Sequence, residues 1–228
     1  MIGREGIDRD SGSGDMVIGR AAAMGLGLAV AMLGLGAIEA PPSPDAPAPG
    51  DSIPADPPPG QLLIASARIG DPRFYHAVIL ILQHTQDGAF GIVINHPLAS
   101  ETIASLLAAT GDIDKTVEGK IPVFAGGPVQ PDLGFLVHSA EYHRAETLAV
   151  DGKVAMTASK EALKDIGRHQ GPKKFFFALG YAGWGAGQLE GEIARKDWFT
   201  TPEDPTLVFD EDSSKIWDRA LTRRQQEL

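Results

Sequence analysis

Apolar runs along the chain predict a series of buried strands. Ala77–Leu82 and Ala89–Asn95 are apolar stretches rich in branched side chains, and the polar stretch Gln83–Gly88 lies between them. Because a polar connection that ends in Asp-Gly is typical of a turn, the two runs predict a β-hairpin with a loop of several residues. Pro97 is expected to end the second strand, since proline cannot donate a ladder hydrogen bond.

Further strands follow from the same pattern. The dipeptide Asp151-Gly152, with apolar segments on both sides, is the strongest two-residue hairpin signal in the chain. The other predicted strands are Ile121–Ala125, Leu133–His138, Glu146–Val150, Lys153–Met156, Lys174–Leu179 and Thr206–Phe209.

Four helices are predicted from capping residues and from apolar side chains at helical spacing. They cover Ser100–Ala109, Ser159–Gly167, about Gly187–Lys196, and a final amphipathic segment that Ser213 caps. Hairpins dominate the order of elements, and strands and helices do not alternate regularly. The pattern therefore favours an α+β fold over a doubly wound α/β fold.

The N-terminal quarter of the chain differs from the rest. Residues 21–38 form an 18-residue run without charge, at the lower limit for a membrane-spanning helix and similar to the apolar part of a secretory signal. Residues 1–20 carry four acids against three arginines, whereas a start at Met16 would give a short basic leader. Residues 1–40 are therefore interpreted as a signal peptide or membrane anchor, or as the product of a misassigned start.

A proline-rich segment separates this leader from the folded part. Residues 41–60 contain nine prolines and three aspartates, a composition typical of an extended linker without secondary structure. The folded domain is expected to span residues 61–228.

Charge and composition exclude several classes of function. Residues 60–228 carry 17 basic and 22 acidic side chains, a net charge of −5, so direct nucleic-acid binding is not expected. The chain has no cysteine, which excludes disulfides, cysteine-ligated zinc, iron–sulfur clusters and a thiol nucleophile.

Motifs for catalysis or metal binding are equally sparse. No serine lies in a G-x-S-x-G motif, and no pair of histidines forms H-E-x-x-H. No catalytic residue, metal ligand or cofactor is therefore predicted. The histidines are scattered along the chain, at His76, His84, His96, His138, His143 and His169.

The segment Gly180–Gly191 is rich in glycine and is predicted to form a turn between a buried strand and a helix. It matches neither the dinucleotide-binding fingerprint nor a P-loop, because no lysine follows the glycines. Its glycines serve a tight turn and close helix–sheet packing, with Trp184 in the core, or they expose backbone amides to an anion or another ligand. Glu190 and Glu192 point to different faces of a helix and do not form an acid–base pair.

Three breaks after apolar strands suggest one binding surface. Strand ends in a curled sheet can gather at a common rim, and each of these breaks has small side chains that leave backbone amides accessible. The alternative is structural: Asn95 bonds a turn backbone, and Gly126-Gly127 serve backbone geometry. Gln188 could add a side-chain amide and Trp184 an aromatic wall. The candidate surface consists of Asn95, Gly126, Gly127, Gly183, Trp184, Gly185, Gln188 and Glu190.

Several ordered motifs resemble the YqgE/AlgH family. They are Leu62-Leu-Ile-Ala65, Asp71-Pro-Arg-Phe74, Gly88–Asn95 with Pro97, Gly126-Gly-Pro-Val129, Gly134–His138, Gly180–Glu190 and Trp198. The resemblance covers about Gln61 to Arg223. It implies an α+β domain in which a bifurcated mixed sheet curls into a pseudo-barrel with helices outside.

The resemblance implies no established activity, cofactor or catalytic residue, although some members are labelled putative transcriptional regulators. His96 stands where members usually have lysine or arginine. Members usually look cytoplasmic, whereas the leader here suggests membrane anchoring or export, with membrane contact only through residues 21–38. The expected function is a non-catalytic regulatory or interaction domain with an unknown protein partner. The alternative is a small-molecule-binding protein or an enzyme that uses the glycine-rich surface.

Overall fold

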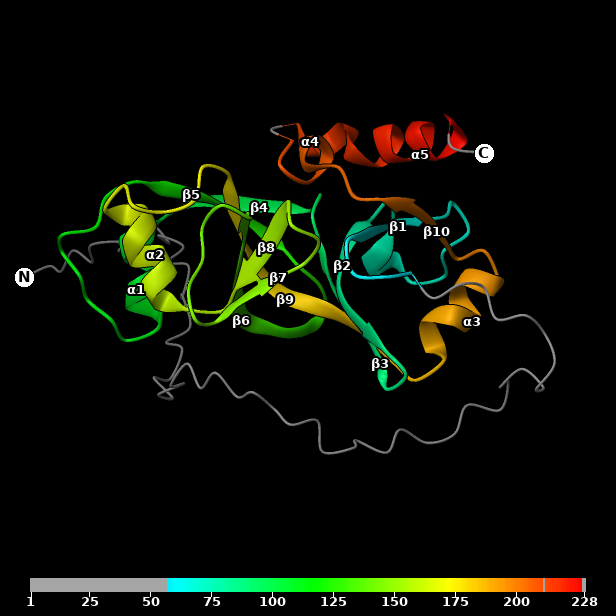
Figure 1. The fold of residues 1–228 in the computed structure, drawn as a ribbon, viewed down its shortest axis with the longest axis horizontal. Coiled ribbons are helices and arrows are strands. Elements are labelled where there is room, and N and C mark those ends of the chain that lie inside the picture. Colours follow the sequence, from blue (N-terminus) through cyan, green and yellow to red (C-terminus); the bar gives the residue numbers. More distant parts are fainter. Residues whose placement is uncertain (1–56, 211, 227–228) are drawn as a thin grey trace, which may run out of the picture.

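The computed structural model describes residues 57–210 and 212–226, which form a curled sheet with helices packed outside it (Figure 1). The predicted leader 1–40 and most of the predicted linker 41–60 lie outside the described residues. Within the described part, no helix is long and apolar enough to cross a membrane. The predicted α+β class is confirmed.

The sheet has ten strands. Their order is β10-β1-β2-β3-β9-β6-β8-β7, and β4 and β5 branch from β9. The strands are β1 (Gln61–Ala65), β2 (Val78–Thr85), β3 (Gly88–Val93), β4 (Pro97–Thr102), β5 (Lys120–Ala125), β6 (Val129–Ser139), β7 (Thr147–Ala149), β8 (Val154–Thr157), β9 (Phe175–Gly185) and β10 (Trp198–Pro202). The helices are η1 (Pro72–Phe74), α1 (Ile103–Ala109), α2 (Lys160–Gly167), α3 (Gln188–Ala194), α4 (Pro205–Val208), η2 (Ser213–Lys215) and α5 (Ile216–Gln226).

The long strand β9 is where the sheet divides. Its first half pairs with β5 in parallel and with β6 antiparallel, and its second half, Ala182–Gly185, pairs with β3. All other pairings between the described strands are antiparallel. The bifurcated mixed sheet that the family resemblance implied is therefore confirmed.

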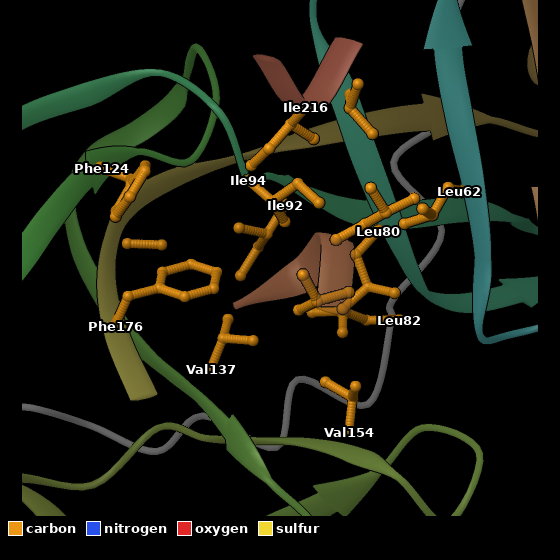
Figure 2. Packing of buried hydrophobic residues seen from close by; sticks show 14 of the residues in the cluster. Leu62, Leu80, Leu82, Ile92, Ile94, Phe124, Val137, Val154, Phe176 and Ile216 are labelled. Carbon is orange, nitrogen blue, oxygen red and sulfur yellow. The ribbon is translucent and has the colours of Figure 1, made fainter. Parts of the chain in front are cut away.

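Both faces of the central strands are buried. In β1, Leu62 and Ile64 enter one cluster while Leu63 and Ala65 enter another, because successive side chains point to opposite faces. The first cluster fills the enclosed side of the curled sheet, where Figure 2 shows Ile216 of α5 packed towards Ile92 and Ile94 of β3 and its continuation. The second cluster lies beneath η1 and α3, and a third packs α1 and α2 against β5 and β6.

Several predicted elements are confirmed with shifted ends. The first hairpin, β2–β3, is tighter than predicted, since Thr85 pairs with Gly88. The β7–β8 loop is longer than two residues, since the last pair is Ala149 with Ala155 and the Asp151 carboxylate accepts hydrogen bonds from the loop backbone. Ser159 caps α2 as predicted.

Four predictions of local structure are wrong. Ser213 does not cap the final helix, because it lies within η2 and α5 begins at Ile216. Ser100 lies in the edge strand β4, and the helix begins three residues later because the Thr102 hydroxyl accepts a hydrogen bond from Ser105 N–H. The expected strand Thr206–Phe209 is instead α4, which Asp204 caps and Pro205 starts. The expected glycine-rich turn continues β9 as far as Gly185.

The described chain makes contacts before the predicted domain boundary. Gly60 is buried and its backbone bonds to Ile81 and Glu203. The Pro57 carbonyl oxygen lies 2.9 Å from His84 Nδ1. These contacts attach residues 57–60 to β2 and to the end of β10.

Candidate functional site

A cavity of about 300 Å³ opens beside the second half of β9. Its walls come from four parts of the chain, which are the Ile69–Phe74 segment, Pro128–Val129, Gly183–Trp184 and the α3–β10 region. These parts are distant in sequence, and the branching of the sheet at β9 brings them together. A second, smaller cavity of about 110 Å³ lies between α1, α2 and β9 and contains none of the predicted site residues.

Glu192 of α3 organises one wall of the cavity. One carboxylate oxygen accepts hydrogen bonds from the indole N–H groups of Trp184 (2.9 Å) and Trp198 (2.8 Å), and the other accepts one from the Gln188 amide (2.9 Å). The two indole rings meet edge to face, with centroids 6.0 Å apart. Charge-assisted hydrogen bonds of this kind fix both tryptophans in place.

Two arginines stand at the mouth of the cavity. Arg73 forms a 2.6 Å ion pair with Asp71, and Arg195 forms a 3.2 Å ion pair with Asp197. The hydrogen bonds from Arg73 hold the pKa of Asp71 below its usual value, and Asp71 raises the pKa of Arg73. The arginine side chains are 65% and 62% exposed, against 32% and 29% for their aspartates, so the arginine is the more accessible partner of each ion pair.

One edge of β9 is open beside the cavity. On the β6 side, the described pairing stops at Val129 with Tyr181, and no described strand pairs with Ala182–Gly185 on that side. Gly185 N–H donates a 3.2 Å hydrogen bond to the Gln188 side chain. Backbone groups on such an edge can pair with another chain.

The structure brings most of the candidate surface together. Gly183, Trp184 and Gln188 line the cavity. Gly126 and Gly127 lie directly before its Pro128–Val129 wall and contact the β9 backbone, as Gly126 N–H donates to Leu179 O at 2.7 Å.

The other candidate residues point elsewhere. The Asn95 side chain is buried between β2 and β3, where it accepts a hydrogen bond from Val78 N–H and donates one to His76 O, each at 2.8 Å. Glu190 faces away from the cavity and lies 2.6 Å from His84 Nε2. Glu192 faces the cavity, so the two glutamates lie on different faces of α3, as their spacing predicts. Gly185 lies at the end of β9 outside the cavity lining.

Sequence reasoning missed Asp71, Arg73, Glu192, Arg195 and Trp198 as site residues. The spacing of Gln188 and Glu192 was a usable signal, because residues four apart share one face of a helix. Among the described residues, no group of three or more His, Asp or Glu side chains is arranged to hold a metal ion.

Comparison with known proteins places this chain in a family. The sequence profile of a family described as AlgH-like matches residues 62–228. The chain belongs to the AlgH family. UPF0301 proteins of Jannaschia sp. and Sphingopyxis alaskensis are 43% and 41% identical to it, covering 71% of this chain in each case and 85% and 86% of the relative.

Two solved structures share the fold. The solution structure of AlgH from Pseudomonas aeruginosa superimposes with a TM-score of 0.63 at 36% identity, covering 72% of this chain and 87% of that one. Protein DIP2367 from Corynebacterium diphtheriae, at 22% identity and a TM-score of 0.57, covers 73% and 87% and supports the fold alone. The motifs that resemble the AlgH family at Asp71–Phe74, Gly126–Val129 and Gly180–Glu190 each contribute residues to the cavity.

Proposed function

We propose that this AlgH-family domain is a non-catalytic binding module that recognises a partner protein through the cavity and its arginine-lined mouth. One observation carries the proposal. Three of the chain segments that carry the family resemblance meet at this cavity, although they are far apart in sequence. Recognition of a partner is a function that such a surface can perform without a nucleophile or a cofactor.

The hydrogen bonding of the cavity suits recognition better than chemistry. Glu192 is held by two indoles and an amide, and each arginine at the mouth is paired with an aspartate. A general base or nucleophile needs a reactive group that is available to the substrate. The net charge of −5 on residues 60–228 supports a protein partner over a nucleic acid.

The proposal is tested by affinity purification of the tagged full chain from native cells. Arg195→Glu reverses a charge at the mouth and costs about 1 kcal/mol or less, since the ion pair is exposed. Arg168→Glu is the matched control, because Arg168 is an exposed arginine paired with Asp114 at the end of α2. We expect Arg195→Glu to lose the partner and Arg168→Glu to keep it. Equal recovery of the partner with both variants would contradict the proposal.

Gln188→Ala tests the cavity itself, because this side chain links the β9 edge to Glu192. We expect equal thermal stability and weaker partner capture. A variant with lower thermal stability and normal partner capture would show that Gln188 has only a structural role.

The volume of the cavity favours one alternative, a small-molecule ligand. About 300 Å³ lies at the lower end of the range for ligand pockets. A metabolite panel scored by thermal shift separates this alternative from the first, since a ligand that binds the folded state raises the unfolding temperature.

A further inference from the structure

We infer that the partner binds as an extended peptide strand that adds to the open edge of β9, with an acidic side chain held between Arg73 and Arg195. This inference rests on the proposed function and goes beyond it by naming the form and the charge of the ligand. It combines three observations, which are the unpaired strand edge, the cavity beside that edge and the exposure of the arginines.

The first observation is the unpaired edge. Ala182–Gly185 pairs with β3 on one side, and β6 leaves β9 after Tyr181 on the other. The Gly127 backbone packs against Tyr181 and Ala182, and the Gly185 N–H bonds to the Gln188 side chain, so the part of this edge left for a short guest strand is centred on Gly183 and the Gly185 carbonyl. Main-chain hydrogen bonds to such an edge supply affinity for many extended peptides.

The second observation is the space beside this edge. Gly183 is exposed, lines the cavity and has no side chain to obstruct a neighbouring backbone. A Cβ atom at Gly185 would meet nothing within 4 Å. Alternate side chains of a guest strand point to one face, so every second side chain could enter the cavity while the backbone pairs with β9.

The third observation concerns charge. Arg73 and Arg195 are about twice as exposed as the aspartates that pair with them. Arg195 bonds Asp197 through Nε, and no other described carboxylate bonds its two terminal nitrogens, which can meet a second carboxylate. Three carboxylates, Asp71, Glu192 and Asp197, line the same cavity, so an acidic side chain is complementary to the exposed guanidinium groups alone and not to the cavity as a whole.

The first experiment uses a displayed library of random linear 12-residue peptides, panned against the full chain. We expect the enriched peptides to share an acidic residue beside at least four positions without proline, because proline cannot donate to a strand edge. Enrichment of basic peptides, or of none, would overturn the inference. Occupation of the cavity by residues 41–56 of this chain, or by a second copy, would block enrichment and would also overturn it.

The second experiment tests the strand pairing directly. In an antiparallel pair, alternate residues of the guest direct their N–H groups to the edge. We therefore expect N-methylation of one alternate set of peptide amides to weaken binding by about tenfold or more, and methylation of the other set to change it little. Equal effects of the two sets would contradict strand addition.

The third experiment tests the charge. Arg195→Glu should weaken binding of the selected peptide by about tenfold. Replacing the acidic residue of the peptide by lysine should restore binding to this variant. Arg168→Glu should bind like the wild type. Failure of the charge swap would overturn the acidic contact.

These outcomes separate the inference from the proposed function. If Arg195→Glu and Gln188→Ala lose the native partner while no extended peptide binds the wild type, the proposed function stands and the inference fails. If these two variants capture the native partner as well as the wild type does, the proposed function and the inference both fail.

Discussion

Replacement of Glu203 by glutamine should make the domain more stable at alkaline pH and change its stability much less near pH 5. Glu203 follows β10, and its side chain is 2% exposed. One carboxylate oxygen accepts a 2.9 Å hydrogen bond from Lys153 of the β7–β8 loop, and its backbone N–H donates to Gly60 O. The side chain therefore lies where the β7–β8 loop meets the ends of β1 and β10.

The ionisation of Glu203 is unfavourable at this position. Burial raises its pKa from 4.5 to about 7, the neighbouring Asp151 raises it as well, and Lys153 opposes the change. Burial also raises the pKa of Asp151, but hydrogen bonds from Glu203 and from the Lys153 and Val154 backbone outweigh it, so the pKa stays below its usual value. Below pH 7, protonation of Glu203 would allow its buried Oε2, which accepts no hydrogen bond from the described residues, to donate to the neighbouring Asp151.

The direction in which stability changes with pH follows from proton binding. Between pH 4.5 and 7 the folded state holds the Glu203 proton more tightly than the unfolded state does. This contribution to stability is complete below pH 4.5 and is lost as the pH rises through about 7. The shift corresponds to an upper limit of about 3 kcal/mol, and water around the 60%-exposed Lys153 reduces it.

Denaturant unfolding at about pH 5, 6, 7 and 8 measures this contribution. The Glu203→Gln amide can accept from Lys153 and donate to Asp151 without titrating. The stability of the variant minus that of the wild type should be smallest at pH 5, about a quarter of its full value, and rise to between about 1 and 3 kcal/mol at pH 8. Glu118→Gln, at an exposed position, is the control and should show no such trend. A Glu203→Gln variant that is less stable than the wild type at pH 8 would refute the reasoning, since the Lys153 ion pair would then dominate.

Three further substitutions test the structural roles of site residues. Asn95→Ala leaves the buried Val78 N–H without its acceptor and should cost about 1–3 kcal/mol in chemical unfolding, with partner capture unchanged. Gly126→Ala would place a Cβ atom 2.4 Å from Gly180 O and should cost about 3 kcal/mol or more, whereas Gly185→Ala, into open space, should stay within about 0.5 kcal/mol. Glu192→Ala removes the acceptor of two indoles and should cost about 2–4 kcal/mol and shift tryptophan fluorescence; unchanged emission would show that Glu192 does not hold the rings.

The sequence predicts those elements that are amphipathic or wholly apolar in themselves. The run Ala77–Leu82 and the helix after Ser159 each carry enough apolar side chains to specify their own structure. β4 carries no such signal, because all six of its residues are exposed and pairing with β5 alone makes it a strand. β10 is also short and mixed in polarity, and it is fixed by its antiparallel pairing with β1.

The candidate site was predictable only in part, for the same reason. Glycine and tryptophan motifs identified one wall of the cavity in advance, at Gly183 and Trp184. Arg73 and Arg195 are ordinary exposed residues in the sequence, and only the fold places them at one mouth. Asn95 lies at a strand end, where asparagine often bonds a backbone group, and its amide does bond the Val78 and His76 backbone instead of facing the cavity.

The glycines around β9 explain why the sheet divides where it does. Gly180 has a φ of +71°, a conformation that other residues rarely adopt, and it lies between the half of β9 that pairs with β5 and the half that pairs with β3. One residue further along β9, the backbone of Gly127 packs so closely that a Cβ atom there would lie 2.1 Å from the carbonyl carbon of Tyr181. Only glycine lets the β5–β6 connection approach β9 this closely. The local bend that the sequence suggested as a turn is thus one kinked residue within a continuous strand. The pairing of β6 with β9 stops just after this kink, at Tyr181. No described strand therefore pairs with Ala182–Gly185 on the β6 side of β9.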